Sequence, residues 1–275
     1  MTNGTNLILY IFYSCNLLYQ PQNNHIMKKT AIIIFSFLLV VFFALSVYAQ
    51  QEDNQLYYCI KNIVKPEKID EFKELQKKFA SACKEYNYPF AYSAWQSSTP
   101  DFYFFWPVKD YNEAKEVMNK AWGDVIPNIE QDWGAKYQET VDAWDDFFIK
   151  SIDNLSYNPE TSVDGLVYAE WWITYPKPGT GSEFNIFFKR AIEMDQKANF
   201  EYPIFRFQSD IGMSRPAIIT VMWGKNPADL YAHSQEDGEI LGEEVLEMWN
   251  DLKSKKRKSE KIPFWYMEDS SYSPE

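Results

Sequence analysis

Histidine is nearly absent from this sequence. Only two of the 275 residues are histidine, and one of these, His25, precedes the part of the chain that we expect to be mature. A metal site built from several histidines is therefore excluded. A catalytic triad would have to use His233, and no nucleophile motif surrounds any serine. Gly179-Thr180-Gly181 precedes a predicted helix but lacks the lysine and the hydroxyl residue of a phosphate-binding loop.

Cysteine is scarce as well, with three in the whole sequence. Cys59 falls on a predicted strand, and Cys83 lies on the helix that follows, on the side expected to face the sheet. The antiparallel return of that helix brings Cys83 back toward Cys59. An exported chain can join such a pair in a disulfide. Two buried thiols are the alternative.

Basic residues are outnumbered by acidic ones, 27 to 39. The predicted leader contains two of the lysines and no acid, so the mature chain carries 25 basic and 39 acidic side chains, a balance of −14. Such a surface repels phosphate backbones, which excludes nucleic acid as a partner. The one basic cluster, at residues 253–258, lies near a predicted helix C-terminus, where positive charge offsets the helix dipole.

A secretory signal peptide is predicted over residues 27–49. Met27-Lys28-Lys29 gives it a positive start, an apolar run follows over residues 31–47, and Val47-Tyr48-Ala49 supplies the small residues that a signal peptidase recognises. The run is slightly short for a membrane span, which needs about 20 residues. We therefore expect cleavage after Ala49, export to the periplasm or the extracellular space, and no stable membrane insertion afterwards.

Residues 1–26 contain no acidic or basic residue and are interpreted as upstream sequence from a mis-chosen initiator. The alternative is that residues 27–49 stay uncleaved and hold the protein at a membrane as a signal anchor. No cysteine directly follows the apolar run, so a bacterial lipid anchor is not indicated.

The remaining chain repeats itself. Tyr86-Asn87-Tyr88-Pro89-Phe90 returns as Phe200-Glu201-Tyr202-Pro203-Ile204, and the Ser-Tyr-Asn-Pro-Glu of residues 156–160 returns as Ser-Tyr-Ser-Pro-Glu at residues 271–275. Three further residues recur at one constant offset: Pro100, Lys109 and Trp133 map onto Pro216, Lys225 and Trp249. We therefore divide the mature chain into one repeat over residues 50–160 and a second over residues 161–275.

Each repeat is expected to contain four strands and two helical regions. β-branched and aromatic runs predict the strands, Pro and Gly clusters separate them, and Asp110 and Asn226-Pro227 are expected to cap the long helices. The strands are predicted over residues 56–63, 90–96, 102–108 and 147–153, and over 166–174, 203–209, 217–223 and 262–268. The helices are predicted over residues 66–86 and 110–146, and over 182–198 and 226–258.

The order βαββαβ, with both crossover helices on one face of an antiparallel sheet, is the ferredoxin-like arrangement. Two such units in tandem resemble the dimeric α/β-barrel superfamily, which includes antibiotic-biosynthesis-type monooxygenases, NIPSNAP-like proteins and chlorite-dismutase-like haem proteins. The resemblance covers the whole mature chain and rests on element order and repetition. It implies an α+β fold in which two sheets pack face to face as one barrel, with a pocket between them. Such a fold does not fix function.

Strand alternation predicts which side chains face that pocket. On the strand over residues 166–174 we assign Val167, Ala169, Trp171 and Ile173 to the helix-covered face, so that the residues between them point into the barrel. The predicted barrel-facing residues are Tyr168, Glu170, Trp172, Arg206, Gln208 and Thr220 in the second repeat and Tyr58, Ile60, Tyr92, Phe102 and Phe104 in the first. The barrel-facing residues of the second repeat are more polar and those of the first are more apolar. This combination predicts a site for an amphipathic small molecule.

Two charged residues of this set and one helix histidine are candidate site residues. Glu170 and Arg206 are expected to form an ion pair across the pocket, either to bind a ligand or only to neutralise each other. His233 lies early on the last long helix, and in haem-binding members of the superfamily a helix histidine ligates the iron. The alternative for His233 is an exposed histidine on a polar helix face.

The leading hypothesis is an exported α/β-barrel protein that binds a small, partly apolar molecule without a cofactor. A cofactor-free monooxygenase-like enzyme or a haem-using enzyme is one alternative. A structural or interaction module with a fully packed barrel is the other.

Overall fold

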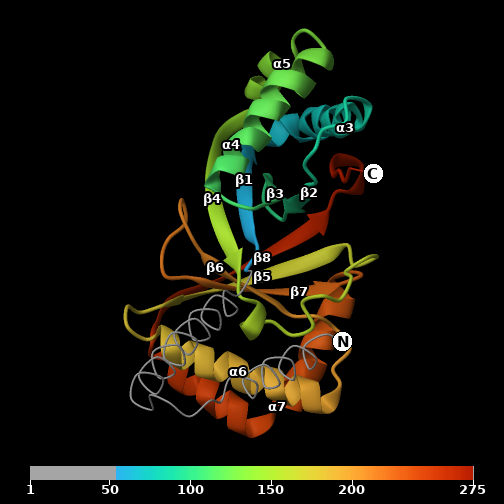
Figure 1. Ribbon diagram of the computed structural model, residues 1–275. Coiled ribbons are helices and arrows are strands. Elements are labelled where there is room, and N and C mark those ends of the chain that lie inside the picture. Colours follow the sequence, from blue (N-terminus) through green and yellow to red (C-terminus); the bar gives the residue numbers. More distant parts are fainter. Residues whose placement is uncertain (1–53, 275) are drawn as a thin grey trace, which may run out of the picture. The chain divides into compact units, whose positions relative to one another are not determined.

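The structure is a computed structural model that describes residues 54–274 (Figure 1). The predicted upstream segment, the predicted signal peptide and its cleavage site lie outside the described residues. Within residues 54–274, no helix is both long enough and apolar enough to cross a membrane.

Eight antiparallel strands close into a barrel in the order β1-β3-β2-β8-β5-β7-β6-β4, and β4 pairs again with β1. Each half of the chain therefore contributes four neighbouring strands, β4-β1-β3-β2 and β8-β5-β7-β6, in the same relative order. The halves join where β2 pairs with β8 and where β4 pairs with β6. The strands are β1 (Leu56–Val64), β2 (Ser93–Ser97), β3 (Asp101–Val108), β4 (Val141–Ser151), β5 (Tyr168–Pro176), β6 (Phe205–Ser209), β7 (Ile218–Gly224) and β8 (Lys256–Tyr266).

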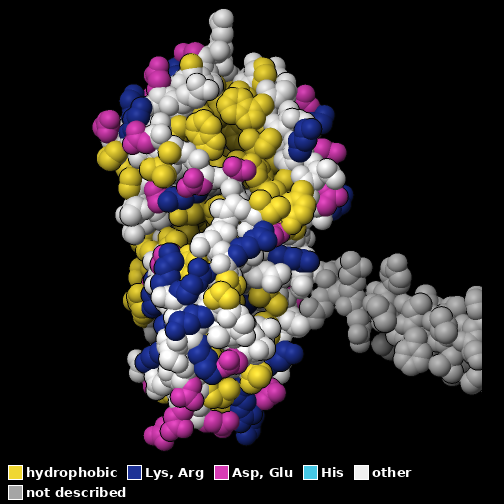
Figure 2. Space-filling view, turned by 90° about the vertical axis from the view of Figure 1, so that its left-hand side faces the viewer, with side chains coloured by type: hydrophobic (Ala, Val, Ile, Leu, Met, Phe, Trp, Pro, Cys, Tyr) yellow, Lys and Arg dark blue, Asp and Glu magenta, His cyan; other side chains and the backbone are white. Residues whose placement is uncertain are grey.

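Helices cover the outside of the barrel on two opposite sides (Figure 1). The first half supplies α3 (Ile69–Glu85), α4 (Tyr111–Lys120) and α5 (Trp133–Thr140), and the second half supplies α6 (Gly181–Ala198) and α7 (Pro227–Lys253). Acidic and basic side chains are spread over the face shown in Figure 2, and hydrophobic side chains gather most densely around a hollow in its upper half.

The predicted caps of both long helices are confirmed. The Asp110 carboxylate accepts hydrogen bonds from the backbone N–H groups of Asn112 and Glu113, at 2.8 and 2.9 Å, and so satisfies two donors that have no partner within α4. The Asn226 side chain accepts from the N–H of Asp229 at 3.0 Å, with Pro227 at the first helical position of α7.

Two strands begin earlier than the sequence pattern predicts. β4 begins at Val141 and β8 at Lys256, each six residues before its predicted start, because the preceding helices end at Thr140 and Lys253. Five of the six added residues of β4 are exposed and three of them are aspartate, so hydrophobic alternation gave no strand signal there. Their backbone groups instead pair with β1. Pairing with a neighbouring strand has overridden local propensity.

Both faces of the barrel sheet are buried. The inner face packs on itself across the barrel, and the outer face packs against the helices as separate clusters in the two halves. Cys59 belongs to the inner cluster, whereas Cys83 belongs to the outer cluster beneath α3. Both are free thiols: Cys59 points to the inner face of the sheet, and Cys83 lies on α3 against the outer face, so the disulfide alternative is wrong. Burial raises the pKa of the Cys83 thiol to about 12.

Candidate functional site

The alternation of the strands is as predicted, but the two faces were assigned the wrong way round. On β5, Ala169, Trp171 and Ile173 face the barrel interior. Tyr168 and Trp172 lie outside, with Met222 and Leu230. The reason is that both faces are covered, so alternation separates two sets of residues without showing which set lies inside. The same reversal places Tyr58, Ile60, Tyr92, Phe102 and Phe104 in the outer core of the first half.

Glu170 is a buried acceptor on the outer face. Its carboxylate accepts hydrogen bonds from the hydroxyls of Tyr168 and Tyr231 at 2.9 and 2.8 Å, and from Nε1 of Trp172 at 2.8 Å. Lys261 Nζ lies 3.9 Å away. These partners satisfy the charge, and the predicted ion pair with Arg206 is not formed.

Arg206 is also buried on the outer face, with 4% of its surface exposed. Its Nη1 donates to the backbone carbonyl of Leu155, and its guanidinium carbon lies 4.4 Å from the centre of the Phe188 ring. Burial lowers the pKa of Arg206 to about 10, against the attraction of Asp237 and Asp195.

His233 is buried rather than exposed, so the alternative of a solvated helix histidine is wrong. Its ring stacks on Tyr202, and its Nε2 lies 3.3 Å from Asp229. It lines neither of the two large cavities described below. An iron ligand has to point toward the space that holds the haem. The placement of His233 therefore does not fit a histidine-ligated haem in either cavity.

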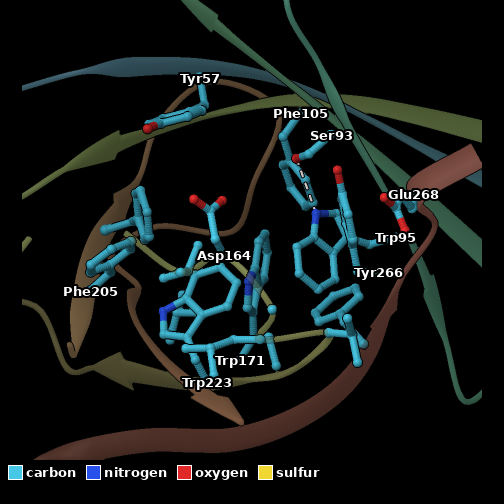
Figure 3. A pocket seen from close by; sticks show the side chains of 18 of the residues that line it. Tyr57, Ser93, Trp95, Phe105, Asp164, Trp171, Phe205, Trp223, Tyr266 and Glu268 are labelled. Atoms are coloured by element: carbon cyan, nitrogen blue, oxygen red, sulfur yellow. Dashed lines mark hydrogen bonds between the residues drawn. The ribbon is translucent and has the colours of Figure 1, made fainter. Parts of the chain in front are cut away.

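A cavity of about 620 Å³ lies at one end of the barrel interior and is called the barrel cavity below (Figure 3). Nine of its nineteen lining residues are aromatic, and its volume lies within the range of small-molecule sites. The aromatic residues are Tyr57, Trp95, Phe105, Trp171, Phe205, Phe207, Trp223, Phe264 and Tyr266.

The opposite half of the barrel is filled. Buried side chains of the inner cluster, among them Cys59, Tyr103, Phe147, Ile173 and Ile219, pack there and do not line the cavity. One end of the barrel is therefore packed with side chains, and the other end contains the cavity. The hypothesis of a fully packed barrel without a pocket does not fit this structure.

The segment between the two halves forms part of the cavity wall. Val163, Asp164, Gly165, Leu166 and Val167 all line it. The Leu166 N–H donates to the Val163 carbonyl at 3.0 Å, and Gly165 has φ +77°, which is the third position of a type II turn. This turn presents Asp164, whose carboxylate turns toward the space enclosed by the aromatic side chains in Figure 3. Glu268, two residues after the end of β8, is the other charged residue of the wall.

Edge-to-face contacts hold the aromatic walls at angles to one another. The Trp95 ring lies 5.6 Å from Trp223, and Trp223 lies 5.5 Å from Phe205, with interplanar angles of 61° and 68°. Trp95 Nε1 donates to Ser93 Oγ at 3.0 Å. The buried Nε1 of Trp223 has no acceptor among the described residues.

A second cavity of about 420 Å³ lies between α6, α7 and the outer face of the second-half strands, and is called the helix cavity below. Three predicted site residues, Trp172, Arg206 and Thr220, line it together with Asp237. Tyr168 and Glu170 lie on the same outer face without lining it, and Gln208 is exposed. Three of the predicted site residues therefore do lie around one cavity, but it lies on the outer face of the sheet and not inside the barrel.

The helix cavity adjoins a buried pair of acids. Burial, and then the charge of Asp237, raise the pKa of Asp195, and burial raises the pKa of Asp237. Arg206 acts in the opposite direction on both. Neither carboxylate oxygen of Asp195 has a hydrogen-bond partner in the described part of the chain.

Sequence reasoning missed the residues that define the barrel cavity. Trp95 and Trp223 were recognised only as strand residues, and Asp164 was not recognised at all. An Asp-Gly pair between two repeats is a turn signal and was the one feature that pointed to this segment. No local signal shows that the turn folds over the end of a barrel.

The comparisons with known proteins identify the fold. No protein-family model and no curated protein matches the chain. A proposed monooxygenase from Lactobacillus acidophilus NCFM superposes with a TM-score of 0.54 at 7% identity, covering 80% of this chain and 97% of that chain. A second proposed monooxygenase, from Fusobacterium nucleatum subsp. nucleatum, gives 0.54 at 10% identity, covering 79% and 94%.

An anthrone oxidase-like protein gives a TM-score of 0.53 at 9% identity, covering 79% of this chain and 92% of that chain. At these identities the likeness shows the fold alone, an α/β fold built around a closed antiparallel barrel.

Proposed function

We propose that this protein binds a small, largely apolar and flat molecule in the barrel cavity. The observation that carries the proposal is the wall itself, in which nine aromatic side chains surround about 620 Å³ inside an otherwise packed barrel. Because neighbouring rings meet at 61° and 68°, a flat ligand can contact the face of one ring and the edge of another.

The proposal extends to the organisation of the chain. We propose two ferredoxin-like repeats, over residues 50–160 and 161–275, that form one barrel, and the matching strand order of the two halves supports this. The charge, apolar run and small-residue exit over residues 27–49 support export to the periplasm or the extracellular space. Mass spectrometry of the mature N-terminus tests export, because an intact Lys28-Lys29 segment contradicts cleavage.

A cavity-filling pair of variants tests the binding site. Val167 lines the mouth of the barrel cavity and is 45% exposed, and Leu246 lines the helix cavity and is 49% exposed. Each can be changed to Trp with little cost to folding. The probe is N-phenyl-1-naphthylamine, a neutral dye whose fluorescence increases in apolar cavities.

Val167→Trp is expected to lower the affinity for the dye at least tenfold, and Leu246→Trp is expected to leave it unchanged. The reverse pattern moves the site to the helix cavity and contradicts the proposal. Mass spectrometry of small molecules that co-purify with the wild-type chain, but not with Val167→Trp, then identifies the natural ligand.

An enzyme acting in the helix cavity is the second candidate, and the buried acid pair favours it. A carboxyl group whose pKa is raised by burial is suited to general acid–base catalysis. Asp237 lines the helix cavity and is the group that would contact a substrate. Turnover of a compound that Asp237→Asn abolishes and Val167→Trp leaves intact would select this candidate over the first.

A further inference from the structure

The charged groups of the barrel cavity all have one sign. Of the nineteen lining residues only Asp164 and Glu268 are charged, and no Lys, Arg or His lines the cavity. The helix cavity differs, because Arg206, Lys256 and Lys261 line it beside its acids. Neither Asp164 nor Glu268 forms an ion pair with a basic residue in the described part of the chain.

The aromatic rings of the barrel cavity also lack a protein cation. Elsewhere in residues 54–274 several Lys and Arg side chains lie over ring faces, for example Lys261 over Trp172 at 3.8 Å and Lys258 over Tyr175 at 4.4 Å. None of the nine rings that line the barrel cavity has such a partner. Their faces, which carry negative potential, are directed at the cavity and at one another.

Local structure fixes the position of both carboxylates. The turn with Gly165 at its third position holds Asp164 against the aromatic walls, and the Tyr266 N–H donates to the Val167 carbonyl at 2.9 Å, which ties the end of that turn to β8. Glu268 opens a short 3-10 turn two residues after Tyr266. In Figure 3 the Glu268 carboxylate lies beside Trp95 and Tyr266.

We infer that the ligand of the barrel cavity is an organic cation, a quaternary ammonium or a protonated amine with an apolar remainder. The inference deepens the proposed function and rests on it. Several Trp and Tyr faces around one space, with acids at the rim and no base, are the groups that recognise such cations in water. An anionic or neutral apolar ligand would gain nothing from the two carboxylates.

Two probes of one shape test the sign of the charge. (4-Hydroxyphenyl)trimethylammonium carries a positive nitrogen, and 4-tert-butylphenol has a carbon atom in the same place. Isothermal titration of the wild-type chain at neutral pH is expected to show about tenfold tighter binding of the cation, the size of one to two cation–π contacts.

Matched charge variants separate the rim carboxylates from the overall charge. Asp164→Asn with Glu268→Gln is expected to weaken binding of the cation about fivefold and to leave 4-tert-butylphenol unchanged. Asp251→Asn with Glu247→Gln makes the same change in net charge at exposed positions on α7 and is expected to affect neither probe.

The possible outcomes distinguish the two proposals. If 4-tert-butylphenol binds as tightly as the cation, and Val167→Trp abolishes both, the proposed function stands and the inference about charge is wrong. If the two pairs of charge variants have equal effects, the rim carboxylates have no specific role and the inference is also wrong. If neither probe nor the dye binds, the proposed function fails and the inference fails with it.

Discussion

The barrel cavity and the helix cavity lie on opposite faces of the second-half strands, and they differ in chemistry. Trp171 lines the barrel cavity and Trp172 the helix cavity, and Phe205 and Arg206 divide in the same way. The barrel side is aromatic, with charge only at its rim. The helix side contains the buried Arg206 and the acid pair of buried Asp195 and half-buried Asp237. Neighbouring residues of one strand therefore face either an aromatic cavity or a cluster of charged side chains.

The two faces of the sheet differ in how their polar side chains are satisfied. On the helix-covered side Glu170 is satisfied by three donors, and Arg206 faces two acids, because water is excluded there. On the barrel side Asp164 and Glu268 are exposed and need no protein partner. Removing a charge should therefore affect stability on the helix side and ligand binding on the barrel side.

The largest effect is expected from Arg206→Met. Loss of the guanidinium leaves the acid pair of Asp195 and Asp237 buried without a nearby cation, and we expect the free energy of unfolding to fall by about 3 kcal/mol. Denaturant-induced unfolding followed by circular dichroism at pH 7 measures it.

Arg190→Met is the control for this prediction. Arg190 is exposed on α6 and pairs with Glu193 and Glu244, so its loss should cost no more than about 0.5 kcal/mol. Equal losses for the two variants would show that Arg206 does not compensate the acid pair.

Much of the fold was predictable because its signals are local. Proline and capping residues mark the helix starts, and β-branched and aromatic runs mark the strands, so the order of the elements followed from the sequence. The early starts of β4 and β8 did not, since exposed residues such as Asp145 and Lys258 become strand only through pairing with a neighbour.

The site was less predictable for two physical reasons. Both faces of each strand are covered, so Trp171 and Trp172 are equally compatible with the core, and no pattern in the sequence distinguishes inside from outside. The closure of the barrel by the segment containing Asp164 is a long-range event. It depends on the pairing of β8 with β5, which joins residues about 90 positions apart.

An intermediate effect on the free energy of unfolding is expected from the titration of Asp195. Because burial raises the pKa of Asp195 above that of the unfolded chain, folding takes up a proton once the pH exceeds about 4, the ordinary carboxyl pKa. The unfolded state then binds fewer protons than the native state, so stability falls as the pH rises.

We expect Asp195→Asn to weaken this dependence, because only Asp237 then keeps a raised pKa. Relative to the wild type, the variant should gain roughly 2 kcal/mol of stability between pH 5 and pH 8. Thermal unfolding of both proteins across that range measures it. A variant whose unfolding free energy keeps the pH profile of the wild type would show that Asp195 is ionised in the native state.

The smallest effect is expected from a matched pair of glycines. Gly165 and Gly179 both have positive φ, +77° and +86°, both occupy the third position of a turn, and an added Cβ meets no atom within 4 Å at either. Alanine at each position should cost about 1 kcal/mol of unfolding free energy, since only the backbone conformation is strained.

Ligand binding separates the two glycine variants. Gly165→Ala displaces the turn that presents Asp164, so we expect it to weaken binding of (4-hydroxyphenyl)trimethylammonium about threefold. Gly179→Ala alters a turn that lines neither cavity and should leave that affinity unchanged. If both variants lose stability equally and neither loses affinity, the turn closes the barrel without positioning Asp164, and the aromatic walls alone account for recognition.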